Sequence, residues 1–162
     1  MKEKTACFTG HRKIPPEQYK YISEQLEKEI IKSIADGYCF FGTGGALGFD
    51  TLAAQTILRL KNQYPQIRLI LVLPCRNQTK GWKAEDIREY ERIKLLSDKV
   101  VYVSDYYYSG CMIKRNRHLV NNSSLCICYK TKNTGGTAYT VDYARKSGLK
   151  ISCLKSEVKP SD

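Results

Sequence analysis

The sequence predicts an α/β protein with a mostly parallel sheet and helices on both faces. Short strand-like runs rich in apolar, aromatic and cysteine residues alternate with amphipathic stretches along the chain. The connections between these runs are long enough to hold a helix, and such crossovers join parallel strands. The run from Ile67 to Leu73 is almost continuously apolar, which is typical of a strand covered on both faces.

The first elements follow from local patterns. Thr5 to Thr9 is expected to form the first strand. Pro15 and Pro16 then begin a helix, because proline is favoured in the first helical turn. Its apolar positions recur at helical spacing and are Tyr19, Ile22, Leu26 and Ile30. Residues 38–41 are the expected second strand.

The middle of the chain repeats this alternation. A glycine-rich turn is followed by a helix over about 49–62, and 67–73 is the third strand. A polar loop at 74–81 precedes a helix over about 83–97. The inward positions of that helix are expected to be Ile87, Tyr90 and Ile93 or Lys94.

The last third contributes three strands and two helices. The expected strands are 99–103, 125–129 and 149–153, and the helices are 111–121 and a segment through Tyr139, Tyr143 and Ala144. A tyrosine-rich loop occupies 105–110. We expect one domain over residues 1–154 and a polar tail at 155–162.

Length and composition limit the class of protein. The chain has 162 residues, of which 42% are hydrophobic, enough for one domain with a core. No apolar run approaches the roughly 18 residues that span a bilayer, and a strand pattern follows Met1 closely, so a cytoplasmic protein without membrane partners is expected.

The seven cysteines form no Cys-x-x-Cys pair, and most lie in predicted strands. We therefore interpret them as small buried apolar residues and expect neither zinc nor a disulfide set. Cys75 and Cys111 fall at loop positions, where packing is again the preferred interpretation. A Cys75 nucleophile activated by His11 is a minor alternative.

The formal charge of +11, from 27 basic and 16 acidic residues, favours anionic partners. The basic residues are scattered through the predicted helices rather than gathered in a block. A solvated basic surface is therefore preferred to a nucleic-acid groove, which stays as an alternative.

In a parallel α/β sheet the ligand site lies outside the carboxyl ends of the strands, where the strand order reverses. The first loop at that edge is Thr9-Gly10-His11-Arg12, in which a glycine permits close approach and two basic side chains offer donors.

The second loop, Gly42 to Asp50, contains four glycines, and Gly44 and Gly45 are expected to present N–H groups to an anion. It is not the dinucleotide pattern, because it follows the second strand and no acidic residue ends a later strand to bind a ribose. Asp50 has two interpretations of similar weight, a residue favoured by the helix dipole or an acceptor for ribose hydroxyls.

The third loop, Gly135-Gly136-Thr137, adds backbone donors and a hydroxyl at another strand-to-helix turn, which suits a phosphate. Each glycine loop alone is explained by a simple helix start. Two such loops at one sheet edge favour the binding of an anion or nucleotide.

Aromatic and polar residues on neighbouring segments complete the candidate site. Trp82 and Tyr108, within Tyr106–Tyr108, offer faces for a base, although each is also explained as a loop anchor. Asn116 and Arg117 lie one helical turn from apolar positions and can turn inward, or belong to a solvated helix face.

These motifs, in this order, resemble those of the YpsA-like family of the SLOG superfamily. The residues that carry the resemblance are Thr9-Gly-His-Arg12, Gly44 to Asp50, Leu73-Pro-Cys75, Arg115-Asn-Arg117 and Gly135-Gly-Thr-x-Tyr-Thr140. The superfamily includes the LOG phosphoribohydrolases and the DNA-processing protein DprA. The resemblance implies a Rossmann-like fold, a ligand such as ADP-ribose held between the two glycine loops, and pairing into a homo-oligomer.

The resemblance also bears on catalysis. LOG-type hydrolases carry a catalytic glutamate in a Pro-Gly-Gly-x-Gly-Thr-x-x-Glu motif, and the matching position here is Thr140, which cannot act as a carboxylate base. The proline is missing too, and Asp142 lies on another side of the helix. Asp50 is the remaining candidate if the protein is an enzyme; otherwise no catalytic residue, cofactor or metal is expected.

Three hypotheses follow. The first is a binder of a nucleotide-derived anion, acting in signalling or sequestration, with phosphates on the glycine loops, ribose on Asp50, and Arg12 and Arg117 neutralising charge. The second is an N-glycosidase or phosphoribohydrolase that uses Asp50. The third is a DprA-like binder of single-stranded nucleic acid, favoured by the charge.

Overall fold

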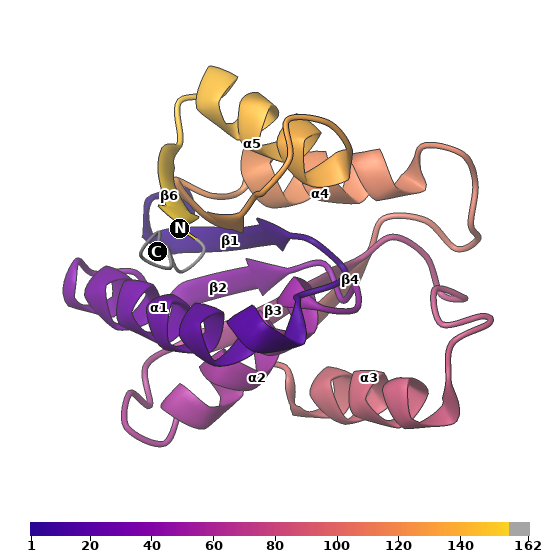
Figure 1. Ribbon diagram of the computed structural model, residues 1–162, viewed down its shortest axis with the longest axis horizontal. Coiled ribbons are helices and arrows are strands. Elements are labelled where there is room, and N and C mark those ends of the chain that lie inside the picture. Colours follow the sequence, from indigo (N-terminus) through magenta and orange to yellow (C-terminus); the bar gives the residue numbers. More distant parts are fainter. Residues whose placement is uncertain (156–162) are drawn as a thin grey trace, which may run out of the picture.

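A computed structural model describes residues 1–155, and it contains a six-stranded sheet with the order β4-β3-β2-β1-β5-β6, all neighbours parallel (Figure 1). The strands are β1 (Thr5–Gly10), β2 (Phe40–Thr43), β3 (Arg68–Leu73), β4 (Lys99–Tyr102), β5 (Leu125–Tyr129) and β6 (Lys150–Leu154). The helices are η1, a 3₁₀ turn (Lys2–Lys4), α1 (Pro16–Ala35), α2 (Phe49–Leu60), α3 (Ala84–Leu96), α4 (Cys111–Asn121) and α5 (Gly136–Lys146). The predicted fold class is confirmed. Apart from Lys155, the polar tail expected at 155–162 lies outside the described residues.

Helices cover the sheet from both sides. In Figure 1, α4 and α5 lie on one face, and α1, α2 and α3 lie on the other. The predicted stripe of α1 is fully buried at Ile22, Leu26 and Ile30, but Tyr19 is 46% exposed because it lies in the first turn of the helix, at the margin of the core. No helix within residues 1–155 is long and apolar enough to cross a membrane.

The strand order reverses beside β1. The chain runs outward from β1 through β2 and β3 to β4, and then crosses back through α4 to place β5 on the other side of β1. A crevice is expected at such a reversal, outside the carboxyl ends of the two strands. The loops after β1 and β5 therefore meet at this edge.

The second strand lies two residues later than predicted. Gly42 and Thr43 pair with Ile70 and Leu71 of β3, so they belong to the sheet rather than to the glycine-rich turn. The absence of a side chain at Gly42 leaves room for Leu119, because an added Cβ would lie only 2.9 Å from the Leu119 Cδ2 atom. The turn itself begins at Gly44.

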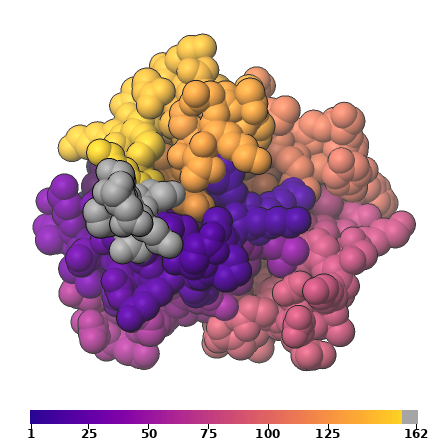
Figure 2. All heavy atoms as spheres, in the orientation of Figure 1, coloured from indigo at the N-terminus to yellow at the C-terminus, as the bar shows by residue number. Residues whose placement is uncertain are grey.

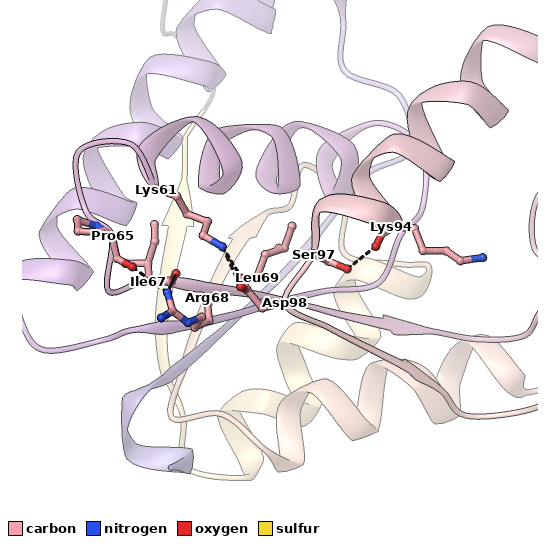
Figure 3. A network of polar contacts seen from close by, with 8 residues as sticks. All are labelled: Lys61, Pro65, Ile67, Arg68, Leu69, Lys94, Ser97 and Asp98. Carbon is pink, nitrogen blue, oxygen red and sulfur yellow. Dashed lines mark hydrogen bonds and ion pairs between the residues drawn. The ribbon is translucent and has the colours of Figure 1, made fainter.

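A polar network secures the outer strands at the opposite end. Asp98, just before β4, accepts hydrogen bonds at Oδ2 from the N–H of Leu69 and from the ammonium group of Lys61, both over 2.8 Å (Figure 3). Burial raises the pKa of Asp98, but these two donors outweigh it and hold that pKa below its usual value. The ionised carboxylate thereby joins the end of α2, β3 and the start of β4.

Candidate functional site

A pocket of about 490 Å³ opens at the strand reversal. It is bounded by the loop after β1, the start of α2, the first turns of α4 and the segment that leads into α5. In Figure 2, the indigo surface of the first residues and the orange surface of the segment before α5 adjoin. Its volume lies in the range of small-molecule sites.

The pocket brings together nine of the fourteen residues predicted for the site. They are Thr9, Gly10, His11, Arg12, Asp50, Asn116, Gly135, Gly136 and Thr137. The other five, Gly44, Gly45, Trp82, Tyr108 and Arg117, do not line it. Two basic lining residues lie outside the predicted site set, namely Lys132 and Arg115, and the sequence analysis named Arg115 only as part of a motif shared with the family.

His11 connects two segments that line the pocket, the loop after β1 and the segment before α5. Its Nε2 atom accepts hydrogen bonds from the N–H of Thr131 over 2.8 Å and from the Thr131 hydroxyl over 3.0 Å. Burial, and then the charge of Lys132, lowers the pKa of His11, so the ring is neutral at physiological pH. An unprotonated Nε2 places the ring proton on Nδ1. His11 therefore acts here as an acceptor that holds the segment before α5.

The same β1 loop also packs on the start of α2. The N–H of Phe49 donates to the carbonyl oxygen of His11 over 3.1 Å. Gly48, with φ of 78°, lies directly beneath the Arg12 carbonyl, where a Cβ atom would collide with that backbone. A glycine at this position lets the loop that carries His11 and Arg12 approach the helix.

The Asp50 side chain lines the pocket and also forms a hydrogen bond with the glycine-rich turn before α2. Its Oδ2 accepts the N–H of Ala46 over 3.2 Å, and the side chain is buried, with 7% of the residue exposed. Burial raises the pKa of Asp50, although the Arg115 guanidinium opposes this shift. The protein's own carboxylate thus binds an N–H group of the glycine-rich turn, that of Ala46, which directly follows the predicted donors Gly44 and Gly45.

Arg115 lies beneath the pocket and is 5% exposed. Its Nη1 donates to the Gly44 carbonyl, its Nε to Asn116 Oδ1 over 2.7 Å and its Nη2 to Met112 Sδ over 3.7 Å. Burial lowers the pKa of Arg115, and Asp50 opposes this. Arg115 is therefore a fixed positive charge that also anchors the Gly44 turn.

Helical spacing could have identified Arg115. The buried residues Cys111, Arg115 and Leu119 recur every four positions along α4 and so form one inward stripe. Arg117 lies on another side, where its Nε donates to the Tyr139 hydroxyl over 2.7 Å and its guanidinium lies 5.5 Å from the Tyr143 ring centroid. Arg117 therefore joins α4 to α5 outside the pocket.

The start of α5 is the open part of the site. Among the described residues, no side chain caps this helix, its first turn has no acidic residue, and no neighbouring residue lies within 4 Å of a Cβ built on Gly135 or Gly136. The first N–H groups of a helix have no partner within it, and its dipole favours an anion there. Thr140, at the position of the LOG glutamate, donates its hydroxyl to the Gly136 carbonyl over 2.8 Å.

The charges lining the pocket are mainly positive. Arg12, Arg115 and Lys132 are basic, and Asp50 is the one acidic residue among the lining residues that belong to the described part of the chain, 1–155. Together with the start of α5, they form an electropositive site with a single buried carboxylate.

The remaining predicted residues have structural contacts elsewhere. Gly45, with φ of 72°, packs against Leu73 in the turn. Trp82 contacts Tyr90 edge to face, with 5.5 Å between the ring centroids, and Tyr108 lies on an exposed loop.

Cys75 is fully buried, and this burial raises the pKa of its thiol. Within residues 1–155, no three His, Cys, Asp or Glu side chains are grouped to hold a metal ion.

Comparison with solved structures finds proteins of similar fold. DprA from Helicobacter pylori, described with a single-stranded DNA binding mode, is similar with a TM-score of 0.67 and 19% identity, over 98% of this chain and 68% of that one. DprA from Streptococcus pneumoniae is similar with a TM-score of 0.68 and 15% identity, over 97% of this chain and 52% of that one.

Comparison of sequences identifies the family. A UPF0398 protein of Brevibacillus brevis is 27% identical over 128 residues, covering 77% of this chain and 68% of the relative. The uncharacterised SPbeta prophage-derived protein YoqJ of Bacillus subtilis is 31% identical over 121 residues, covering 67% of this chain and 71% of the relative. The YpsA family model, described as the YspA SLOG family, matches residues 9–157. The chain therefore belongs to the YspA SLOG family.

Proposed function

We propose that this protein binds a nucleotide-derived anion, of the kind represented by ADP-ribose or a cyclic nucleotide, in the pocket between β1 and α5. The observation that carries the proposal is the open, uncapped start of α5 facing an electropositive pocket at the strand reversal. The family and the DprA-like fold support nucleotide or nucleic-acid binding in general.

The geometry suggests a division of roles within the site. A phosphate group fits the N–H groups at Gly136 and Thr137, with Arg12 and Lys132 neutralising its charge. The buried Asp50 carboxylate is the acceptor available for a ribose hydroxyl. The base has no aromatic partner at Trp82 or Tyr108, so its recognition rests on the shape of the pocket.

The site is better suited to holding a ligand than to cleaving it. Thr140 has no carboxylate, and its hydroxyl hydrogen is engaged by the Gly136 carbonyl. Asp50 is engaged by the N–H of Ala46. Binding without turnover agrees with a role in sequestering or sensing the ligand, whereas a hydrolase that uses Asp50 is the alternative.

Single-stranded nucleic acid is the second candidate ligand. The net charge of +11 and the similarity to DprA favour it. Such binding weakens steeply as salt concentration rises. A small anion enclosed in the pocket is expected to show a much weaker dependence on salt.

The test is a search for ligand bound to the protein of 162 residues. Small molecules released on denaturation are identified by mass spectrometry, and AMP, ADP-ribose, cyclic ADP-ribose, NAD and a single-stranded oligonucleotide are titrated by calorimetry. The mixtures are then assayed for breakdown. Binding of a nucleotide without breakdown supports the proposal, turnover supports the hydrolase, and binding of the oligonucleotide alone supports the third candidate.

A matched pair of variants locates the binding. Gly136→Asp places a negative charge in open space at the start of α5, where it is expected to stabilise the helix but repel an anion. We expect affinity to fall at least about tenfold, equivalent to about 1.4 kcal/mol. Gly136→Asn has a similar shape without the charge and serves as the control. Equal affinity of the two variants would place the anion elsewhere.

A further inference from the structure

Two cysteines face each other on neighbouring strands at the edge of the sheet. Cys128 of β5 pairs in register with Cys153 of β6, and their Sγ atoms lie 2.9 Å apart. Neighbouring strands are about 4.7–4.9 Å apart, which falls within the Cα separation of about 4.4–6.8 Å that a disulfide spans. The backbone therefore allows a covalent bond between these two residues.

Exposure distinguishes this pair from a second one on the same sheet. Cys7 and Cys126 are also in register, on β1 and β5, but both are buried. Cys153 is exposed on the edge strand β6, whereas its partner Cys128 is buried. A reagent in solution can thus reach one thiol of the Cys128–Cys153 pair and neither thiol of the other.

The two thiols are suited to different steps. Burial, together with the contact to Cys153, raises the pKa of Cys128, which keeps it protonated and protected in the reduced protein. Cys153 is the accessible thiol and is expected to react first. Cys128 then lies within reach of the oxidised sulfur.

We propose that Cys128 and Cys153 are a modification site that a hydroperoxide converts reversibly into a disulfide. The Cys153 thiolate attacks the peroxide, so that a sulfur–oxygen bond forms, the oxygen–oxygen bond breaks, and the leaving oxygen takes up a proton. Cys128 loses its proton and attacks the Cys153 sulfenic acid. A sulfur–sulfur bond forms while hydroxide leaves and is protonated to water. Overall, two thiols lose two hydrogens and the hydroperoxide is reduced.

This inference does not depend on the proposed ligand. The disulfide ties β6 to β5 one residue before Tyr129, whose ring contacts the rings of Phe49 and His11 at centroid distances of 6.1 and 5.5 Å. Oxidation thus acts on the strand that leads into the segment before α5.

In the experiment, the reduced protein of 162 residues is treated with hydrogen peroxide, the remaining thiols are alkylated, and the product is digested with trypsin. Cys128 lies in the tryptic peptide 118–130, which also contains Cys126, and Cys153 lies in 151–155. We expect these two peptides to be cross-linked with the loss of two hydrogens, and fragmentation to place the bond on Cys128. Dithiothreitol should restore both free peptides.

Three variants check the assignment. Cys153→Ser and Cys128→Ser should abolish the cross-link, and the control Cys126→Ser, which alters the neighbouring buried thiol, should retain it. Fragmentation that places the bond on Cys126 would overturn the proposal. Over-oxidation of Cys153 or dimers linked through it, without the internal cross-link, would overturn it as well. Because fragmentation of the wild-type product locates the bond directly, the result stands even where a variant folds poorly.

Discussion

The Nε2 atom of His11 accepts the Thr131 N–H over 2.8 Å, and this bond joins the loop after β1 to the segment before α5. Residues of both segments line the pocket, and His11 and Thr131 are 120 residues apart in the chain. A single neutral imidazole thereby couples the β1 loop to the helix start where we place the phosphate.

The substitution His11→Phe should distinguish the contribution of the hydrogen bond to Thr131 from that of the ring packing against Tyr129. The phenyl ring can keep the edge contact with Tyr129 but has no acceptor for Thr131. We expect the free energy of unfolding to fall by about 0.5–1.5 kcal/mol and nucleotide affinity to fall by several-fold. Urea denaturation and calorimetry measure the two effects. His118→Phe, on the far part of α4, is the matched control and should leave affinity unchanged.

The contribution of His11 should also depend on pH. Its pKa in the folded protein lies below the ordinary value of 6.5, so the unfolded chain binds the proton more readily. The stabilisation is therefore complete above pH 6.5 and is lost as pH falls below it towards the folded pKa. The difference in unfolding free energy between wild type and His11→Phe should shrink over that range. A constant difference would show that His11 is not held neutral by its site.

Replacing either of two glycines near the pocket by alanine should have opposite effects on stability. A Cβ at Gly44 would collide with the Arg115 guanidinium, whereas a Cβ at Gly136 would have none of residues 1–155 as a neighbour within 4 Å. Gly44→Ala is expected to cost about 1–3 kcal/mol of stability because it displaces a buried charge from its acceptor. Gly136→Ala should be neutral or stabilise by up to about 1 kcal/mol. Thermal unfolding of the two variants side by side checks the contrast, and equal losses would contradict it.

Asp98 provides a prediction on stability away from the site. Asp98→Asn keeps an acceptor for the Leu69 N–H but loses the charge paired with Lys61, so we expect a loss of about 1–2 kcal/mol at neutral pH. The folded pKa of Asp98 is depressed, and its contribution is therefore present above the ordinary value of 3.8 and lost as pH falls through the folded pKa. Urea denaturation at neutral and strongly acidic pH should show the difference between wild type and variant vanish in acid.

The sequence patterns predicted the fold and the sheet edge at which the pocket opens, because periodicity and glycine turns are local signals. They could not tell which glycines are in contact with other parts of the protein. Gly44 and Gly136 look alike in sequence, yet the Gly44 carbonyl is bound by Arg115 from a distant helix, and the surroundings of Gly136 are open. Trp82 and Arg117 were expected in the site for their chemistry, and each is instead engaged by tyrosines. These outcomes depend on tertiary contacts that no local pattern encodes.

Asp50 tests whether the ligand includes a ribose. In Asp50→Asn an amide oxygen can still accept the Ala46 N–H, so the turn should persist, but the carboxylate that we assign to a ribose hydroxyl is removed. We expect affinity for AMP to fall by about 1.5–3 kcal/mol, the worth of hydrogen bonds to a charged group. Affinity for inorganic phosphate, which needs only the start of α5 and the basic residues, should change little or increase, because a negative charge has been lost nearby. Calorimetric titration of both ligands against both proteins provides the comparison, with Asp142→Asn, an exposed carboxylate on α5, as the control for charge alone. An equal loss for AMP and phosphate would mean that Asp50 acts only by shaping the pocket, and an unchanged AMP affinity would move the ribose away from it.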